Sequence, residues 1–407
     1  MRDTISWPPR GTSRRGVGFW GIVLLTVLIT VATFSTAAFG SGVSPGPPSV
    51  VPASPTGKAE AVAVGATGRG MLDGAPQSVG TGLRLMVAAD LPVLLDVDSG
   101  RTTPIVGLPH GDGQLHHVLR VGNNSVIISS RTCDGCRPTG RAFVLQGRTA
   151  VPLGSAWSVA PSLDGQGVWM LAHAGDDRCT LSEMGLDGVL RHPARPIDCR
   201  AQLRKETPAG ILVDLPADGY QPPDSALLDP ETGEAVGRYP PIEAMTEHVT
   251  LTESGAGSEP PVAGEYGRFA LMDLLSGTRD LLPWPSRLAW TGEAAEDPTG
   301  RFLAVEFVDP SHGPGQLMDV WVLDTEARRW LQLPQMPTYT DLKRTSMAWT
   351  TDGRLVMLGT FDGLGDAVVT WGAGEGHLSY SRVDLPDARG DASLVVLPTR
   401  EASAAAR

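Results

Sequence analysis

A β-hairpin pattern that recurs along the chain constrains the fold more than any other feature of the sequence. The clearest copy, residues 319–334, reads DVWVLDTEARRWLQLP, with apolar residues alternating on both sides of Asp-Thr-Glu-Ala. This alternation around a short turn is typical of two antiparallel strands. Similar hairpins recur about every 46 residues, with turns marked by Asp96, Gln146, Gly185, Asp229, Asp273, Asp324 and Trp371. Seven all-β units of this length predict the blades of a β-propeller.

A second pair of apolar runs precedes most of these hairpins. In the third unit, the runs 156–159 and 168–171 flank Asp164-Gly165, and the sixth and seventh units show comparable pairs. Asp-Gly turns tolerate the positive φ that tight hairpins require. Each unit is therefore predicted to contain four strands, which is the composition of one propeller blade.

The turn between the first two predicted strands of the seventh unit carries a family resemblance. Its sequence, Trp349-Thr350-Thr351-Asp352-Gly353-Arg354, resembles the Trp-Ser-Pro-Asp-Gly-Lys type inner turn of the propeller repeats in the TolB and WD40-like superfamily. The resemblance covers roughly residues 80 to 398 and is clearest in the third, sixth and seventh units. It implies an all-β propeller. The fifth unit departs most, because Gly, Glu and Pro interrupt it at residues 255–264.

The last apolar run of the chain, Ser393 to Leu397, follows a complete seventh unit, whereas the first unit begins near Leu83 and is one strand short. We expect the last run to complete the first blade, which would leave no open sheet edge. Seven blades are predicted, although six or eight would also fit the pattern. Blade-strand tryptophans are expected to pack between blades: Trp157, Trp169, Trp290, Trp349 and Trp371.

The amino-terminal segment predicts a membrane anchor. Residues 17–40 contain no charged side chain, and as a helix they would reach about 36 Å, enough for a hydrocarbon core of roughly 30 Å. Arginines precede this run, which places residues 1–16 in the cytoplasm and the propeller outside. The alternative is a secretory signal cleaved after residues 38–40, which would release the domain. Both interpretations export the propeller.

The remaining boundaries follow from composition. Residues 41–80 are rich in Pro, Gly and Ser and are predicted to be a linker. The propeller is expected at 81–398 and a disordered tail at 399–407. The chain has 33 basic and 45 acidic residues, for a net charge of −12, so nucleic acid is not an expected partner. An envelope protein or a small ligand is expected instead.

Four cysteines predict two disulfides, because thiols of an exported domain tend to be oxidised and their number is even. Cys133 and Cys136 flank a turn in the second unit, whereas Cys179 and Cys199 lie at the two ends of one hairpin. Bridges 133 to 136 and 179 to 199 are expected. A zinc site with this spacing, or a thioredoxin-like motif without a βαβ unit, does not fit the pattern.

No catalytic, metal or cofactor motif is supported. His116 and His117 begin a predicted inner strand, where one of them could line the central channel as a metal ligand or general base. Adjacent strand residues face opposite sides, so at most one of the two can do so. The run Asp96 to Gly100 starts like a calcium loop but has Gly107 at the twelfth position, where an EF-hand needs Glu, so a hairpin turn is expected.

These observations favour a membrane-anchored, extracytoplasmic β-propeller that binds a protein or ligand, or that serves as a scaffold, in the cell envelope. No catalytic residue and no cofactor is predicted. The alternative is an exported propeller enzyme, such as a hydrolase, lyase or quinoprotein, with its site at the central channel. Several carboxylates or histidines converging on that channel would favour the enzyme, whereas a variable loop face would favour binding.

Overall fold

A computed structural model describes the chain between residues 80 and 398. The described ranges are 80–88, 91–110, 114–131, 139–175, 178–215, 224–254, 268–286, 288, 290–309, 317–334, 336, 345–361, 364–385 and 393–398. The chain divides into a unit that contains all of them and a second unit, 13–68, that lies wholly outside them. The predicted anchor and tail, and the predicted linker apart from Gly80, also fall outside the described residues. None of the described residues belongs to a helix that could span a bilayer.

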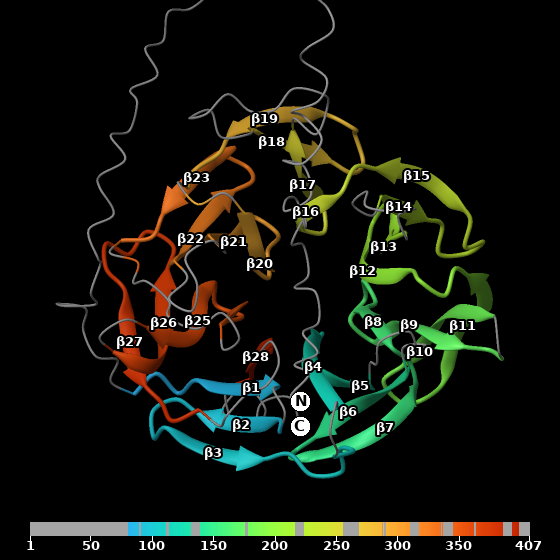
Figure 1. The fold of residues 1–407 in the computed structure, drawn as a ribbon, viewed down its shortest axis with the longest axis horizontal. Coiled ribbons are helices and arrows are strands. Elements are labelled where there is room, and N and C mark those ends of the chain that lie inside the picture. The colour runs from blue at the N-terminus through green and yellow to red at the C-terminus, as the bar shows by residue number, and fades with distance from the viewer. Residues whose placement is uncertain are drawn as a thin grey trace, which may run out of the picture. The chain divides into compact units, whose positions relative to one another are not determined.

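The described residues form 28 strands in seven four-stranded antiparallel sheets, each one blade of a β-propeller (Figure 1). The inner strands of blades one to seven are β28 (Ser393–Leu397), β4 (Gln114–Val121), β8 (Ser158–Pro161), β12 (Gln202–Thr207), β16 (Ile242–Met245), β20 (Trp290–Glu296) and β24 (Ser346–Trp349). The second strands are β1 (Arg84–Ala88), β5 (Asn124–Arg131), β9 (Gly167–His173), β13 (Gly210–Asp214), β17 (Val249–Ser254), β21 (Phe302–Asp309) and β25 (Arg354–Phe361).

The other two strands of each blade form the predicted hairpins. The third strands are β2 (Val93–Asp96), β6 (Thr139–Gln146), β10 (Cys179–Gly185), β14 (Ser225–Leu228), β18 (Arg268–Asp273), β22 (Leu317–Asp324) and β26 (Gly365–Gly372). The outer strands are β3 (Arg101–Pro104), β7 (Thr149–Ser155), β11 (Leu190–Ile197), β15 (Ala235–Tyr239), β19 (Arg279–Pro283), β23 (Arg329–Gln332) and β27 (Ser379–Arg382). The prediction of an all-β fold with seven blades is therefore confirmed.

The first blade combines the two ends of the propeller. β28 pairs antiparallel with β1, from Arg84 opposite Leu397 to Ala88 opposite Ser393. In Figure 1 the red β28 accordingly lies beside the blue β1. A strand from the end of the chain thus occupies the inner position of the blade that starts it, as the sequence predicted, and it covers an edge of β1 that would otherwise be open.

Aspartates close the turns of the hairpins. The carboxylates of Asp96, Asp229 and Asp273 each accept hydrogen bonds from the backbone N–H and the hydroxyl of the residue three positions later. Asp324 accepts from the N–H of Ala327 at 3.1 Å. These are the local side-chain bonds that favour Asp at turns. The Asp96 segment is thus a hairpin turn, as expected, and not a calcium loop.

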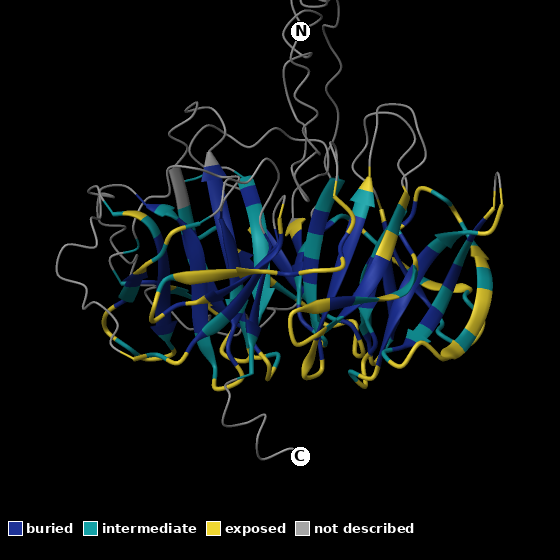
Figure 2. Cartoon of the chain, turned by 90° about the horizontal axis from the view of Figure 1, so that it is seen from below, coloured by how far each residue is buried: buried dark blue, intermediate teal, exposed yellow. Residues whose placement is uncertain are grey.

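The hydrophobic core lies mainly between adjacent blades. One cluster joins buried residues of blades six and seven, another joins blades seven and one, and a third joins blades one and two. Figure 2 shows this buried layer in the middle of the ring and exposed residues along the turns. Trp169, Trp349 and Trp371 are buried, and the Nε1–H of Trp349 donates to the carbonyl of Ala295 in the neighbouring blade at 2.9 Å. Tryptophans thus pack between blades as predicted, although Trp157 directly precedes β8.

The ring has two different faces. Because neighbouring strands are antiparallel, inner-to-second and third-to-outer turns lie on one face, here called the short-turn face. The opposite face, here called the variable face, carries the second-to-third connections and those between blades. The connections between second and third strands differ in length. In blade seven, β25 ends at Phe361 and β26 begins at Gly365, whereas in blade five β17 ends at Ser254 and β18 begins only at Arg268. The interruption predicted at residues 255–264 falls between β17 and β18 in the sequence and lies outside the described residues.

Candidate functional site

Charged side chains gather on the inner strands of blades four to six, which lie around the centre of the ring (Figure 1). The set Arg204, Lys205, Glu243, Glu293 and Glu296 is here called the inner-strand cluster. Burial of such groups is unfavourable unless partners compensate the charge. The partners of each member therefore indicate what the cluster can do.

Lys205 links three consecutive blades. Its Nζ on β12 forms an ion pair with Oε2 of Glu296 on β20, and lies 3.7 Å from Oε1 of Glu247, which precedes β17 of blade five. The other oxygen of Glu296 accepts the backbone N–H of Glu247 at 2.7 Å. Burial raises the pKa of Glu296, and the positive charge of Lys205 opposes that shift. These contacts of the Lys205 ammonium group stabilise the packing between blades. They also reduce its capacity to bind a substrate.

Glu243 on β16 is the member that could exchange a proton. Burial raises the pKa of its carboxyl group, while a hydrogen bond from the hydroxyl of Thr291 on β20 partly opposes the shift. The positive charge of Arg204 also opposes it, but that guanidinium is engaged by Asp214, with Nε 2.6 Å from Oδ2. A carboxyl group with a raised pKa is a candidate general acid.

Two further carboxylates, those of Glu293 and Glu306, lie in blade six. Glu293 accepts a hydrogen bond from the hydroxyl of Ser346 in blade seven at 3.0 Å, and its own N–H donates to Oε2 of Glu306 at 3.1 Å. Glu306 on β21 is only 4% exposed. These bonds again connect neighbouring blades and satisfy buried carboxylate oxygens.

The two histidines singled out in the sequence lie on the inner strand of blade two, since β4 runs from Gln114 to Val121. His116 is 4% exposed, whereas His117 is partly exposed. They are therefore in different environments, and their strand belongs to blade two whereas the inner-strand cluster is on blades four to six. A role in the central channel stays a prediction.

The predicted disulfide between Cys179 and Cys199 is confirmed. It joins the start of β10 to the residue that follows β11 by two positions, with the two Cα atoms 5.1 Å apart. His173 lies against this bridge, with Nδ1 3.3 Å from Sγ of Cys179. Because the two sulfurs are bonded to each other, they do not provide thiolate ligands for a metal. Cys133 and Cys136 lie outside the described residues.

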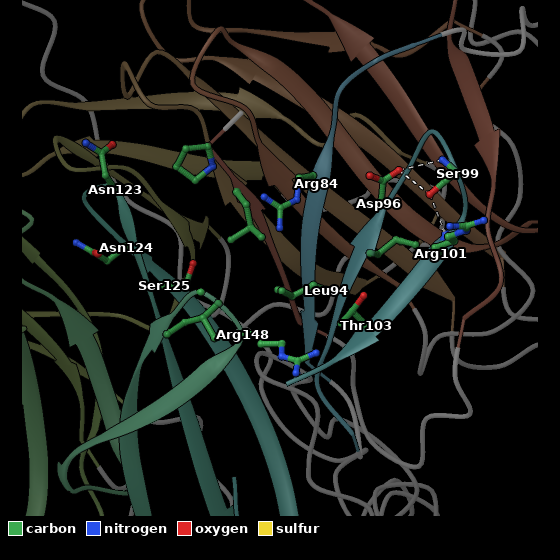
Figure 3. A pocket seen from close by; sticks show the side chains of 15 residues that line it. Arg84, Leu94, Asp96, Ser99, Arg101, Thr103, Asn123, Asn124, Ser125 and Arg148 are labelled. Carbon is green, nitrogen blue, oxygen red and sulfur yellow. Dashed lines mark hydrogen bonds between the residues drawn. The ribbon is translucent and has the colours of Figure 1, made fainter. Parts of the chain in front are cut away.

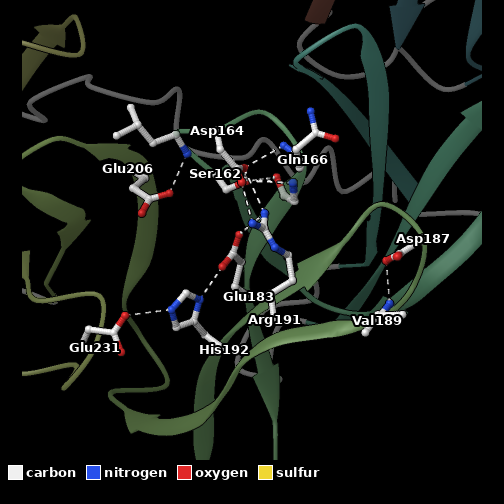
Figure 4. A network of polar contacts seen from close by, with 12 residues as sticks. Ser162, Asp164, Gln166, Glu183, Asp187, Val189, Arg191, His192, Glu206 and Glu231 are labelled. Atoms are coloured by element: carbon white, nitrogen blue, oxygen red, sulfur yellow. Dashed lines mark hydrogen bonds and ion pairs between the residues drawn. The ribbon is translucent and has the colours of Figure 1, made fainter.

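A network of ion pairs lies on the short-turn face between blades three and four (Figure 4). Arg191 contacts Asp164 at 2.5 Å and Glu183 at 2.9 Å. His192 contacts the second oxygen of Glu183 at 2.5 Å and, through its other nitrogen, Glu231 at 3.1 Å. The hydrogen bond to Glu183 is the largest cause of a raised pKa of His192. This network attaches the outer hairpin of blade three to the turn of blade four.

A pocket of about 590 Å³ lies on the short-turn face between blades one and two (Figure 3). Its apolar residues include Leu94 and Leu145, and its polar residues include Asn123, Asn124 and Ser125. Three arginines also line this pocket, which is here called the arginine pocket: Arg84, Arg101 and Arg148. Its volume is in the range of sites that bind small molecules.

The sequence reasoning did not identify the inner-strand cluster or the arginine pocket. A signal for the first was present in β12, whose residues Gln202 to Thr207 include two cations and an anion where a buried strand would be apolar. No comparable signal marks the pocket, because Arg84, Arg101 and Arg148 belong to separate strands and turns. They come together only because blades one and two pack against each other.

The sequence matches no protein-family model and no curated protein. Similar solved structures include TolB from Acinetobacter baumannii, with 13% identity over 77% of this chain and 68% of that one and a TM-score of 0.40. The β-propeller domain of the Trilobed protease from Pyrococcus furiosus has 11% identity over 77% and 98%, and a TM-score of 0.46. A proposed 6-phosphogluconolactonase from Bacteroides fragilis has 12% identity over 79% and 99%, and a TM-score of 0.49. The similar structures thus include TolB and another β-propeller, while the propeller fold of this chain is established by its own seven four-stranded sheets.

Proposed function

We propose that this chain is a membrane-anchored, extracytoplasmic binding module of the cell envelope. The observation that carries the proposal is the contrast between the two faces of the ring. Seven rigid sheets hold tight turns on the short-turn face, while the connections on the variable face differ greatly in length from blade to blade. Loops that vary on a rigid scaffold are where binding residues concentrate.

Blade five offers the strongest candidate segment for contact with a partner. The connection between β17 and β18 reads GAGSEPPVAGEYG and combines two glutamates with Val, Tyr and two prolines. Tyr is enriched at interfaces, and proline limits the freedom that a loop loses on binding. The partner proposed for this face is an envelope protein.

The state of the inner-strand cluster supports binding over catalysis. Lys205, Arg204 and Glu293 each contact a residue of another strand, so much of their bonding capacity serves the ring itself. A catalytic constellation instead needs a nucleophile or base aimed at a position where substrate can sit. The apolar segment 17–40 supports the anchor, because it is long enough to cross a bilayer.

A pull-down from solubilised envelope with the full-length chain tests the proposal. Replacing residues 255–267 with a short Gly-Ser connection should abolish capture of the partner identified with the wild type. The matched control is Leu275→Ser in the same blade, because Leu275 is 65% exposed in a turn of the short-turn face. Equal capture by the wild type and the shortened variant would contradict the assignment of the variable face.

A propeller enzyme is the second candidate, and Glu243 is the observation that favours it. Its raised pKa and its place on an inner strand fit a general acid at the axis of the ring. Hydrolysis of a panel of nitrophenyl esters and glycosides by the wild type, with loss of activity in Glu243→Gln, would put this candidate first. The same panel left unchanged by that substitution would remove it.

A further inference from the structure

The arginine pocket on the short-turn face is distinct from the variable face to which partner binding is proposed above. Its floor is apolar, because Leu94, Leu145 and Leu397 belong to the hydrophobic cluster between blades one and two. Its arginines stand on β1, at the start of β3 and in the turn between β6 and β7. The pocket therefore combines a hydrocarbon surface with several positive charges.

The three guanidinium groups are available to a ligand. Within the part of the chain that the structure describes, no ion pair or hydrogen bond engages the guanidinium group of Arg84, Arg101 or Arg148; the backbone N–H of Arg101 donates to the Ser99 hydroxyl at 3.4 Å. Other arginines at turns of the same face differ: Arg191 contacts two carboxylates, and Arg301 contacts Asp324 at 2.9 Å. Unpaired guanidinium groups that line one concave surface are suited to bind an oxyanion, with which they form bidentate, charge-assisted bonds.

The one carboxylate that lines the pocket is already engaged by its own turn. Oδ1 of Asp96 accepts the N–H of Ser99 at 3.0 Å and the Ser99 hydroxyl at 2.8 Å, and these bonds lower its pKa. Three arginines and one aspartate give the lining a positive balance, although the whole chain carries a net charge of −12. The pocket is therefore a local region of positive charge that attracts anions.

Backbone hydrogen bonds fix the positions from which Arg84 and Arg148 project before any ligand binds. Arg84 lies on β1, which is paired on both sides by β28 and β2. The carbonyl of Arg148 accepts the N–H of Val106 at 3.0 Å, and the N–H of Ala150 donates to the carbonyl of Val106 at 2.8 Å. This bridge joins the segment after β3 to β7 across the two blades. Such preorganisation reduces the entropic cost of binding.

We propose that this pocket binds a small organic oxyanion, either a polycarboxylate or a phosphate ester, that carries an apolar part. The oxyanion is held by Arg84 and Arg148, and the side-chain amides of Asn123 and Asn124 provide further hydrogen-bond donors. The apolar part of the ligand covers Leu94 and Leu145. A volume of about 590 Å³ accommodates a ligand of this size.

Isothermal titration of the full-length chain in mild detergent, in phosphate-free buffer, tests the site. The probes are citrate, phenyl phosphate and neutral benzyl alcohol. We expect one or both anions to bind, and the double variant Arg84→Gln/Arg148→Gln to weaken binding by about tenfold or more, because charge-assisted hydrogen bonds are lost. Arg238→Gln, an exposed arginine on β15 of blade four, is the matched control and should leave the affinity unchanged.

The pattern of binding identifies the ligand class. Tighter binding of citrate assigns a polycarboxylate, and tighter binding of phenyl phosphate assigns a phosphate ester. The proposal is overturned if neither anion binds the wild type, if benzyl alcohol binds as well as the tighter-binding anion, or if the variant retains full affinity. Melting curves establish that the double variant is folded. If it is not, Arg148→Gln alone serves, since that side chain is exposed.

Discussion

Single residues decide whether the buried charges at the axis can be accommodated. A Cβ atom at Gly292 would lie only 2.4 Å from Oε2 of Glu306, which is the oxygen that accepts the N–H of Glu293. Glycine at 292 therefore allows a buried glutamate to approach the backbone of β20. Nothing in the sequence marks this glycine, since the approach depends on the irregular pairing between Thr291 and Ala294.

Asp324 shows what residue-scale reasoning can and cannot predict. Its role as a turn marker was predicted from the hairpin pattern and is confirmed by its hydrogen bond with Ala327. Its ion pair with Arg301, at 2.9 Å, was not predicted, because that arginine lies 23 positions earlier, in the turn before the neighbouring strand β21. Turn chemistry is local, whereas contacts between strands require the register.

The ion pairs of His192 on the short-turn face should make the stability of the folded chain depend on pH. Its hydrogen bond to Glu183 raises the pKa of the imidazole in the folded chain above the unfolded value of about 6.5. Stabilisation from this contact is therefore complete below about pH 6.5 and is lost as pH rises through the folded-state pKa. The contact is worth about 1 kcal/mol or less. His192→Gln should lower the melting temperature by roughly 2 °C at pH 6 and by less at pH 9.

Melting curves of the wild type and the variant between pH 5.5 and 9 check this expectation. His377→Gln, an exposed histidine in a turn of blade seven, provides the control and should show no such trend. A difference for His192→Gln that stays constant, or that grows as pH rises, would show that the contact acts without the charge of the imidazole.

At the scale of elements, the hairpins were predictable and the inner strands less so. Each of the seven predicted turn markers lies within one residue of the end of a third strand, from Asp96 on β2 to Trp371 on β26. Most of these strands contain three or more consecutive buried residues, as in β2, β14 and β18, so they can be recognised as apolar runs. Inner strands such as β12 and β16 carry charged residues, namely Arg204, Lys205 and Glu243, so a hydrophobic pattern cannot identify them.

The disulfide between Cys179 and Cys199 should stabilise the outer edge of blade three. Most residues of β11 are exposed, so packing contributes little to holding it on β10. A bridge over 20 positions is worth about 3 kcal/mol in the loop-closure model. In the variant Cys179→Ser/Cys199→Ser, amide hydrogen exchange in β11 should accelerate by about two orders of magnitude relative to the wild type. Cys133→Ser/Cys136→Ser is the matched control, and equal exchange in all three proteins would contradict the prediction.

At the scale of the whole molecule, the ring brings together residues that no local pattern connects. Lys205 and Glu296 are 91 positions apart and belong to blades four and six, yet they form an ion pair. The arginine pocket likewise unites turns of the second blade with the terminal strand of the chain. The repeat predicts how many blades there are, but the contacts at the axis depend on how the blades close.

Closure of the ring by β28 can be tested by removing it. Leu394, Val395 and Val396 are buried against blades seven, one and two, and three such side chains contribute roughly 6 kcal/mol of burial free energy. Deleting residues 391–407 should therefore lower the melting temperature by roughly 10 °C or more, while deleting only 399–407 should leave it unchanged. A synthetic peptide of residues 391–398 added to the shorter chain should restore part of the loss, because it can pair with the free edge of β1. An unchanged melting temperature after the longer deletion would mean that the other six blades and the rest of the first hold the ring without its terminal strand.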